Sequence, residues 1–71
     1  MKLPRDVSGA QTIRALHRLG FQLMRQTGSH ARLAREGRRV TVPLHGSLAP
    51  GTLRSILRQV GITLDEFLAA L

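Results

Sequence analysis

The residue in this sequence best suited to acid–base chemistry is His30. It follows the turn-forming pair Gly28-Ser29 and opens a predicted strand whose solvent face also carries Arg32 and, from the next strand, Arg39. An imidazole can accept or donate a proton near neutral pH. Guanidinium groups beside it would hold a phosphodiester and stabilise the charge that develops during its cleavage. RNA supplies its own nucleophile, the 2′-hydroxyl, so this set would suffice for RNA cleavage without a metal. A hairpin histidine that only caps a turn is the commoner case, and both roles fit the residues alone.

The other two histidines give weaker signals. His45 follows Pro43 in a predicted loop, where a hydrogen bond at the entry to the next helix and an auxiliary part in catalysis are equally compatible with the sequence. His17 lies within a predicted helix, and we expect a partly buried side chain without a chemical role. Three histidines, four scattered carboxylates and no cysteine provide no spacing typical of a metal site. We expect neither a metal nor a cofactor.

Charge and composition narrow the classes of partner. The 71 residues carry 11 Lys+Arg against 4 Asp+Glu, a net charge of +7, and all the cations but Lys2 are arginine. Such a surplus indicates a phosphate backbone or an acidic protein as the partner. Phe21 and Phe67 are the only aromatic residues, which argues against single-strand RNA readers that stack bases on aromatic platforms. The length suits one domain over residues 1–71, and without a long apolar run we expect a soluble, cytoplasmic protein.

The first predicted element is a helix over residues 8–19. Ser8 and Gln11 form the S-x-x-Q pattern of a capping box, and Gly20 supplies the stop. Helical spacing predicts a buried stripe made of Ala10, Ile13 and Leu16.

Three strands follow, over residues 21–27, 30–35 and 38–42. A two-residue turn at Glu36-Gly37 would pair Leu33 with Val40 and Ala31 with Val42. The opposite face then carries His30, Arg32, Arg39 and Thr41.

The first hairpin allows two registers. A two-residue loop at Gly28-Ser29 would put Phe21 and Leu23 on the face of His30, whereas a three-residue loop would put them in the core. We favour the three-residue loop because it keeps the core on one side of the sheet.

The sequence next predicts a helix over residues 50–60, with Pro50 at its start and Gly61 at its end. A short helix capped by Thr63 follows. The longer helix carries the cationic pair Arg54 and Arg58 beside its apolar seam. The order α-β-β-β-α with a short last helix predicts an α+β domain similar to double-stranded-RNA-binding domains. Its helices would cover one face of a three-stranded antiparallel sheet and leave the other face open.

Several motifs together resemble one family. The segment R-Q-T-G-S-H at residues 25–30 is followed by V-P-L-H and by G-T-L-R-S-I-L-R-Q-V-G-I-T-L-D-E-F-L. In this order, and in so short a chain, they resemble the HicA toxins of bacterial and archaeal toxin–antitoxin pairs. The resemblance extends from Ser8 to Phe67.

The resemblance implies a small mRNA interferase that cleaves mRNA without a metal and blocks translation. A HicB-type antitoxin would neutralise it by covering the active face, and the free toxin would be a monomer. The family's catalytic histidine corresponds to His30, with Gly28 and Ser29 positioning it, and His45 corresponds to a second histidine of less certain role. From the arginine pattern of the sheet face and the second long helix, we expect Arg25, Arg32, Arg39, Arg54 and Arg58 to bind the RNA backbone, together with Gly28 and Ser29 of the turn.

Two other classes of function fit the same basic face. A non-catalytic double-stranded-RNA-binding module would bind RNA with a steep salt dependence and leave it intact. A protein-binding domain would use its arginines against an acidic partner alone and would show no affinity for RNA at low salt.

Overall fold

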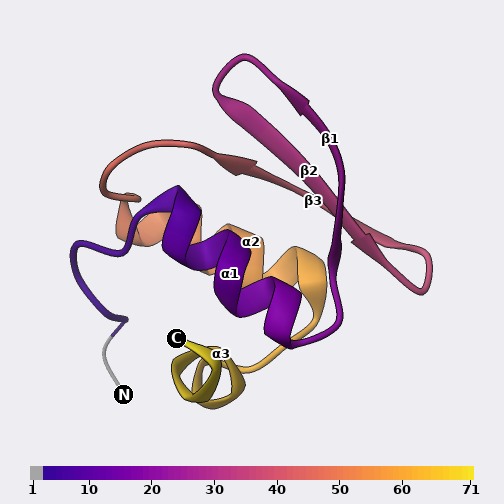
Figure 1. Ribbon diagram of the computed structural model, residues 1–71. Coiled ribbons are helices and arrows are strands. Elements are labelled where there is room, and N and C mark those ends of the chain that lie inside the picture. The colour runs from indigo at the N-terminus through magenta and orange to yellow at the C-terminus, as the bar shows by residue number, and fades with distance from the viewer. Residues whose placement is uncertain (1–2) are drawn as a thin grey trace.

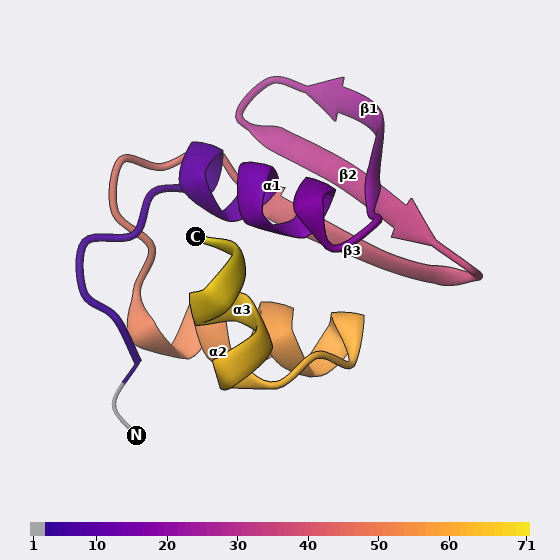
Figure 2. The ribbon, with the colours of Figure 1, turned by 60° about the horizontal axis from the view of Figure 1, so that its bottom comes forward.

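The computed structural model describes residues 3–71 and contains three strands and three helices (Figure 1). In chain order they are α1 (Gly9–Arg18), β1 (Gln22–Thr27), β2 (His30–Arg35), β3 (Arg38–Pro43), α2 (Pro50–Val60) and α3 (Leu64–Ala70). The strands form one antiparallel sheet in the order β1-β2-β3. The helices lie together on one side of this sheet (Figure 2). The predicted α+β architecture is confirmed, including the short last helix.

The predicted start and stop signals fix the helix boundaries. In α1, the Ser8 hydroxyl accepts a hydrogen bond from the Gln11 amide at 3.0 Å, and the Gln11 side chain accepts one from the Ser8 amide at 2.8 Å. Thr63 and Glu66 repeat this reciprocal arrangement at the start of α3. These bonds satisfy amide groups that the first turn of a helix leaves without partners. The predicted span of α2, from Pro50 to Val60, is also confirmed.

The buried face of α1 differs from the predicted stripe. Leu16 is buried as expected, but Ala10 is exposed and Ile13 only partly buried. The buried positions are Gly9, Thr12, Ala15 and Leu16. The helix is rotated because its first turn lies directly against the end of β3: a Cβ atom at Gly9 would overlap with the carbonyl oxygen of Pro43. Thr12 tolerates burial since its hydroxyl donates to the Ser8 carbonyl at 3.0 Å.

The hairpin of β2 and β3 has the predicted register. Leu33 lies opposite Val40 and Ala31 opposite Val42, and all four are buried against the helices. The turn residues Glu36 and Gly37 both have positive φ angles, 48° and 83°, as the type I′ turns of two-residue hairpins require. His30, Arg32, Arg39 and Thr41 are exposed and alternate with the core positions, so they occupy the open face as predicted.

The first hairpin corrects the prediction of a three-residue loop. Thr27 pairs with His30, so the loop is Gly28-Ser29 alone. Phe21 is nevertheless fully buried, and Leu23 lies opposite Leu33. The register shifts between Leu23 and Arg25, which is a β-bulge. The bulge explains how a two-residue loop is compatible with Phe21 in the core. The extra residue reverses the alternation, which puts Phe21 and Leu23 on the helix side while Arg25 stays on the open side.

Candidate functional site

A hollow on the open face of the sheet surrounds His30. Its lining consists of Arg25, Thr27, His30, Arg32 and Thr41, contributed by all three strands. The register explains the grouping, because Thr27 lies across from His30, and Arg32 lies between Arg25 and Thr41. The sheet therefore brings one imidazole, two guanidinium groups and two hydroxyls together at one end of its open face.

The conformation of the turn before His30 is defined by a glycine with a positive φ angle and by one backbone hydrogen bond. Gly28 has a φ of 59°, the left-handed conformation that a type II′ turn requires at its first central position and that glycine adopts without strain. The Ser29 carbonyl accepts a hydrogen bond from the Leu44 amide at 2.6 Å, which ties the turn to the end of β3. Gly28 and Ser29 thus fix the backbone from which the imidazole projects.

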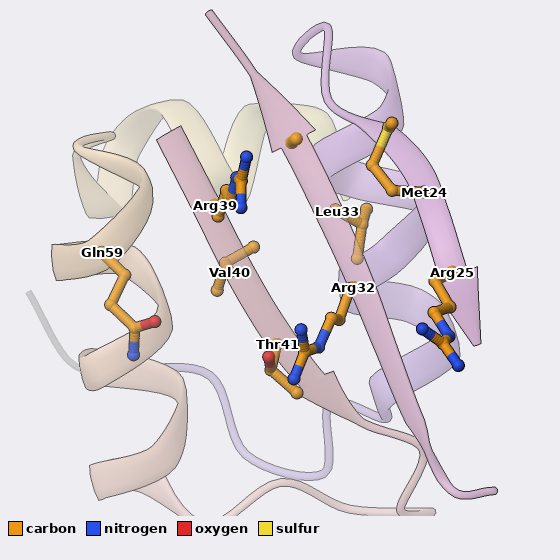
Figure 3. A pocket seen from close by; sticks show the side chains of 9 residues that line it. Met24, Arg25, Arg32, Leu33, Arg39, Val40, Thr41 and Gln59 are labelled. Atoms are coloured by element: carbon orange, nitrogen blue, oxygen red, sulfur yellow. The ribbon is translucent and has the colours of Figure 1, made fainter. Parts of the chain in front are cut away.

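A second hollow continues along the same face toward the other end of the strands (Figure 3). Both hollows are lined by Arg25, Arg32 and Thr41, so they form one continuous depression, here called the sheet groove. The residues that line only the second hollow are Met24, Leu33, Ala34, Arg39, Val40 and Gln59. Gln59 belongs to α2, which runs beside β3 and forms one wall of the groove (Figure 3).

The electrostatics of the sheet groove favour an anion. Arg25, Arg32 and Arg39 are all exposed to solvent along it, and no carboxylate lines either hollow. With 11 cationic side chains and 4 acidic ones in the whole sequence, one-to-one pairing would still leave most of the cations without a carboxylate partner. Phosphate oxygens accept charge-assisted hydrogen bonds from guanidinium groups with good geometry. The groove suits a phosphodiester backbone.

His45 and His17 lie outside the sheet groove. His45 is exposed in the loop after β3, and its carbonyl accepts a hydrogen bond from the Gly9 amide at 2.9 Å. It does not line the hollow around His30. His17 is exposed on α1, which corrects the expectation that it would be partly buried. The structure therefore brings only one of the three histidines to the arginines of the open face.

Arg54 and Arg58 are exposed on α2 but do not line the groove. At about 100° per residue, they lie roughly 140° and 100° around the helix from Gln59, the α2 residue that does. Of the five arginines expected to contact RNA, the fold collects Arg25, Arg32 and Arg39 and leaves this pair apart.

Two further arginines serve the fold itself. The Arg35 guanidinium lies 4.8 Å from the centre of the Phe21 ring and donates a hydrogen bond to the Leu19 carbonyl. Arg18 donates to the Ala70 carbonyl at 2.6 Å, which joins α1 to the end of α3. Their guanidinium groups are engaged inside the molecule, so the surplus of arginine is not wholly devoted to an external partner.

The described part of the chain, residues 3–71, contains no group of three histidine or carboxylate side chains that could hold a metal ion. It also contains no helix long and apolar enough to cross a membrane. What the sheet groove offers chemically is one imidazole for proton transfer, guanidinium groups for an anion and hydroxyls for hydrogen bonds.

Residues 9–62 match the family model described as the HicA toxin of bacterial toxin–antitoxin systems. The chain belongs to the HicA toxin family. The match runs from the start of α1 to just beyond α2, so it includes every residue of the sheet groove and leaves out α3. No individual curated protein matches the chain. A HicA toxin is one half of a toxin–antitoxin pair, so an antitoxin partner follows from the family.

Four residues that line the sheet groove have no role predicted from the sequence: Thr27, Ala34, Met24 and Gln59. Thr27 and Gln59 lie inside the motifs that carry the family resemblance, and Ala34 follows from the alternation of faces along β2. Thr27 could have been found from the two-residue loop, which pairs it with His30. The β-bulge and the packing of α2 beside β3, which bring in the other two, depend on tertiary contacts.

Proposed function

We propose that this HicA toxin is a metal-independent endoribonuclease that cleaves mRNA and thereby blocks translation in the cytoplasm. The observation that carries the proposal is the hollow in which His30 lies with Arg25 and Arg32 on the open face of the sheet. A single imidazole and an anion site suffice for RNA cleavage, because the substrate contributes the attacking hydroxyl.

In the proposed reaction, His30 accepts the proton of the 2′-hydroxyl as its oxygen attacks the neighbouring phosphorus. The bond from phosphorus to the 5′-oxygen breaks, and that oxygen takes a proton from a solvent water to leave as a hydroxyl; the imidazolium of His30 then returns its proton to the hydroxide. The products are a 2′,3′-cyclic phosphate and a free 5′-hydroxyl. Arg25 and Arg32 would bind the non-bridging oxygens, whose negative charge increases in the transition state. Arg39 would bind the backbone further along the groove.

We expect both partners, the mRNA and the antitoxin, to bind the open face of the sheet. An mRNA strand would bind in the sheet groove through its phosphates, and a HicB-type antitoxin would inhibit the toxin by covering that groove. The small domain has the parts for this reaction without a cofactor.

Cleavage of RNA in the presence of EDTA tests the proposal. We expect the wild-type chain to cleave, and His30→Ala to reduce the rate by at least about a hundredfold, the usual contribution of a general acid or base. His30 is exposed, so this variant should keep its fold and its affinity for RNA. His17→Ala, an exposed histidine on α1, is the matched control and should cleave normally. His45→Ala, compared alongside, measures any auxiliary role of the second histidine.

Two results would contradict the proposal. Undiminished cleavage by His30→Ala would remove the assigned base, and a strict requirement for Mg²⁺ would remove the metal-independent mechanism. If the wild-type chain bound RNA and left it intact, the protein would instead be a non-catalytic RNA-binding module.

A further inference from the structure

Met24 is a residue that the strand pairing does not need. Leu23 pairs with Leu33 and Arg25 with Arg32, so the partners on β2 are consecutive while those on β1 are separated by Met24. Without Met24, the same pairs would form a regular ladder, with Leu23 still toward the helices and Arg25 still toward the open face. The bulge adds one side chain to the groove and leaves the faces of its neighbours unchanged.

The added side chain is apolar and unusually exposed. Met24 is 66% exposed, the most of any large hydrophobic residue that the structure describes. It stands on the open side of the sheet and lines the groove beside Arg25 (Figure 3). An exposed apolar side chain at the rim of a depression provides a surface against which a flat apolar group can pack.

The two ends of the sheet groove differ in chemistry. Around His30 the lining is entirely polar, with histidine, threonine and arginine. At the other end Met24 and Ala34 combine with two polar groups, Arg39 from β3 and Gln59 from α2. The Gln59 amide nitrogen donates to Ser55 at 3.1 Å, which leaves its carbonyl oxygen and one N–H free for another partner. Apolar surface flanked by such donors and acceptors matches the face and edge of a nucleobase.

We propose that the end of the sheet groove formed by Met24, Ala34, Arg39 and Gln59 is a nucleobase subsite. It would hold the base of a nucleotide next to the phosphate bound between Arg25 and Arg32, with its face against Met24 and its edge toward Arg39 and Gln59. From His30 to Ala34 the strand β2 extends about 13 Å, a span that accommodates one phosphate and the adjoining nucleoside. The position of the phosphate rests on the function proposed above, whereas the subsite rests on the bulge and the lining of the groove.

The subsite would make the toxin sensitive to the base at one position of its RNA. Methionine has a polarizable thioether and three rotatable bonds, so it packs against flat rings of different outline. It would take the place of the aromatic platform that this sequence lacks. Selectivity among the bases would then come from the N–H donors of Arg39 and from the amide N–H and carbonyl oxygen of Gln59, which would form hydrogen bonds with the edge of the base.

Binding of a short RNA to the His30→Ala protein tests the subsite, because we expect this variant to cleave too slowly to alter the RNA during a binding measurement. A fluorescent hexaribonucleotide is compared with versions from which one base at a time has been removed. We expect one position at which loss of the base weakens binding about fivefold, as for loss of a partly buried apolar contact. Adding Met24→Ala or Gln59→Ala should weaken binding of the intact RNA by a similar factor and abolish the penalty at that position.

Leu23→Ala is the matched control. Leu23 is adjacent to Met24 and 51% exposed, but it lies on the helix side of the sheet, opposite Leu33. This variant should retain the full penalty for the missing base. Deletion of Met24 is a second test, since a regular ladder should fold with His30, Arg25 and Arg32 in place and should lack the base dependence.

The outcomes separate the two proposals. A penalty that persists in both Met24→Ala and Gln59→Ala, or equal binding of all the abasic RNAs, would overturn the subsite even if the wild-type chain cleaves RNA. RNA that binds with the predicted base dependence but is not cleaved by the wild-type chain would overturn the nuclease and support the subsite.

Discussion

Arg25 lies directly opposite Arg32 in the ladder between β1 and β2. Like charges at directly opposed positions destabilise a strand pair, by a few tenths of a kcal/mol up to about 1 kcal/mol. The pairing is compatible with a stable sheet because both side chains are exposed to water on the open face. An anion held between them would convert the repulsion into two charge-assisted hydrogen bonds.

Replacing one of these arginines should therefore have opposite effects on stability and on binding. For Arg32→Thr we expect the free energy of unfolding to rise by about 0.5 kcal/mol, since threonine suits a strand and the repulsion is lost. Affinity for RNA should fall, and the slope of log affinity against log salt should decrease by about 0.7–1. Denaturant unfolding and binding at several salt concentrations measure both. Arg14→Ala removes the same charge from α1, outside the groove, and should leave the slope nearly unchanged.

The close contact between Gly9 and β3 predicts a severe effect for a small substitution. Gly9→Ala should lower the free energy of unfolding by about 2–3 kcal/mol, because the added methyl group would overlap with the Pro43 carbonyl oxygen and force the first turn of α1 away. Gly51→Ala in α2 is the matched control. A Cβ there meets no atom within 4 Å, so the same change should be neutral or stabilising. Equal stability of the two variants would show that the contact does not constrain α1.

The capping box of α3 predicts a dependence of stability on pH. Hydrogen bonds from the Thr63 backbone amide and from its side chain lower the pKa of Glu66 from its ordinary value of 4.5. In acid the unfolded chain therefore binds this proton more readily than the folded one. The stability that Glu66 contributes is present above its ordinary pKa and is lost as pH falls through the lowered value.

Glu66→Gln should remove this part of the acid sensitivity while the cap remains, since Gln11 fills the same position in α1. The reciprocal change Gln11→Glu should introduce a similar sensitivity at α1. Urea unfolding at neutral and acidic pH measures both effects. If Glu66→Gln lost as much stability in acid as the wild-type chain, the capping carboxylate would not be the source.

The proposed mode of inhibition makes a prediction about the antitoxin. If the antitoxin covers the sheet groove, it should present carboxylates to Arg25, Arg32 and Arg39 and should compete with RNA. Arg32→Thr would then weaken binding of both partners, and both interactions would weaken with salt. Competition between purified antitoxin and a labelled RNA measures this. A complex that binds RNA as tightly as the free toxin, or leaves His30 and Arg32 exposed, would exclude inhibition by covering the groove.

Local signals in the sequence were sufficient for most of the fold. Reciprocal side-chain and backbone hydrogen bonds at Ser8 and Thr63, and the stop at Gly61, involve only neighbouring residues, so they can be predicted without tertiary information. The register of β2 and β3 follows from a two-residue turn that requires positive φ angles at Glu36 and Gly37. That register alone puts His30, Arg32 and Arg39 on one face.

The errors arose where distant contacts decide the local structure. Phe21 can be buried on the same side of the sheet as Ala31 and Leu33 in two ways, with a longer loop or with a bulge, and the structure has the bulge. The helical period predicts that Ala10 lies on the buried face of α1, whereas it is exposed. The helix is rotated by the approach of Gly9 to Pro43, which no periodicity reveals. The groove end near Gln59 was missed for the same reason.

The β-bulge has one more consequence, for association of the protein with itself. The strand β1 is at the edge of the sheet, and all six of its residues are exposed. A straight, exposed edge strand offers a row of amide and carbonyl groups to which another chain can add, and natural proteins interrupt such edges with bulges and charges. The extra residue at Met24 and the charge of Arg25 interrupt this edge at its middle. The irregularity that shapes the groove is thus also one of the features by which natural proteins limit edge-to-edge aggregation.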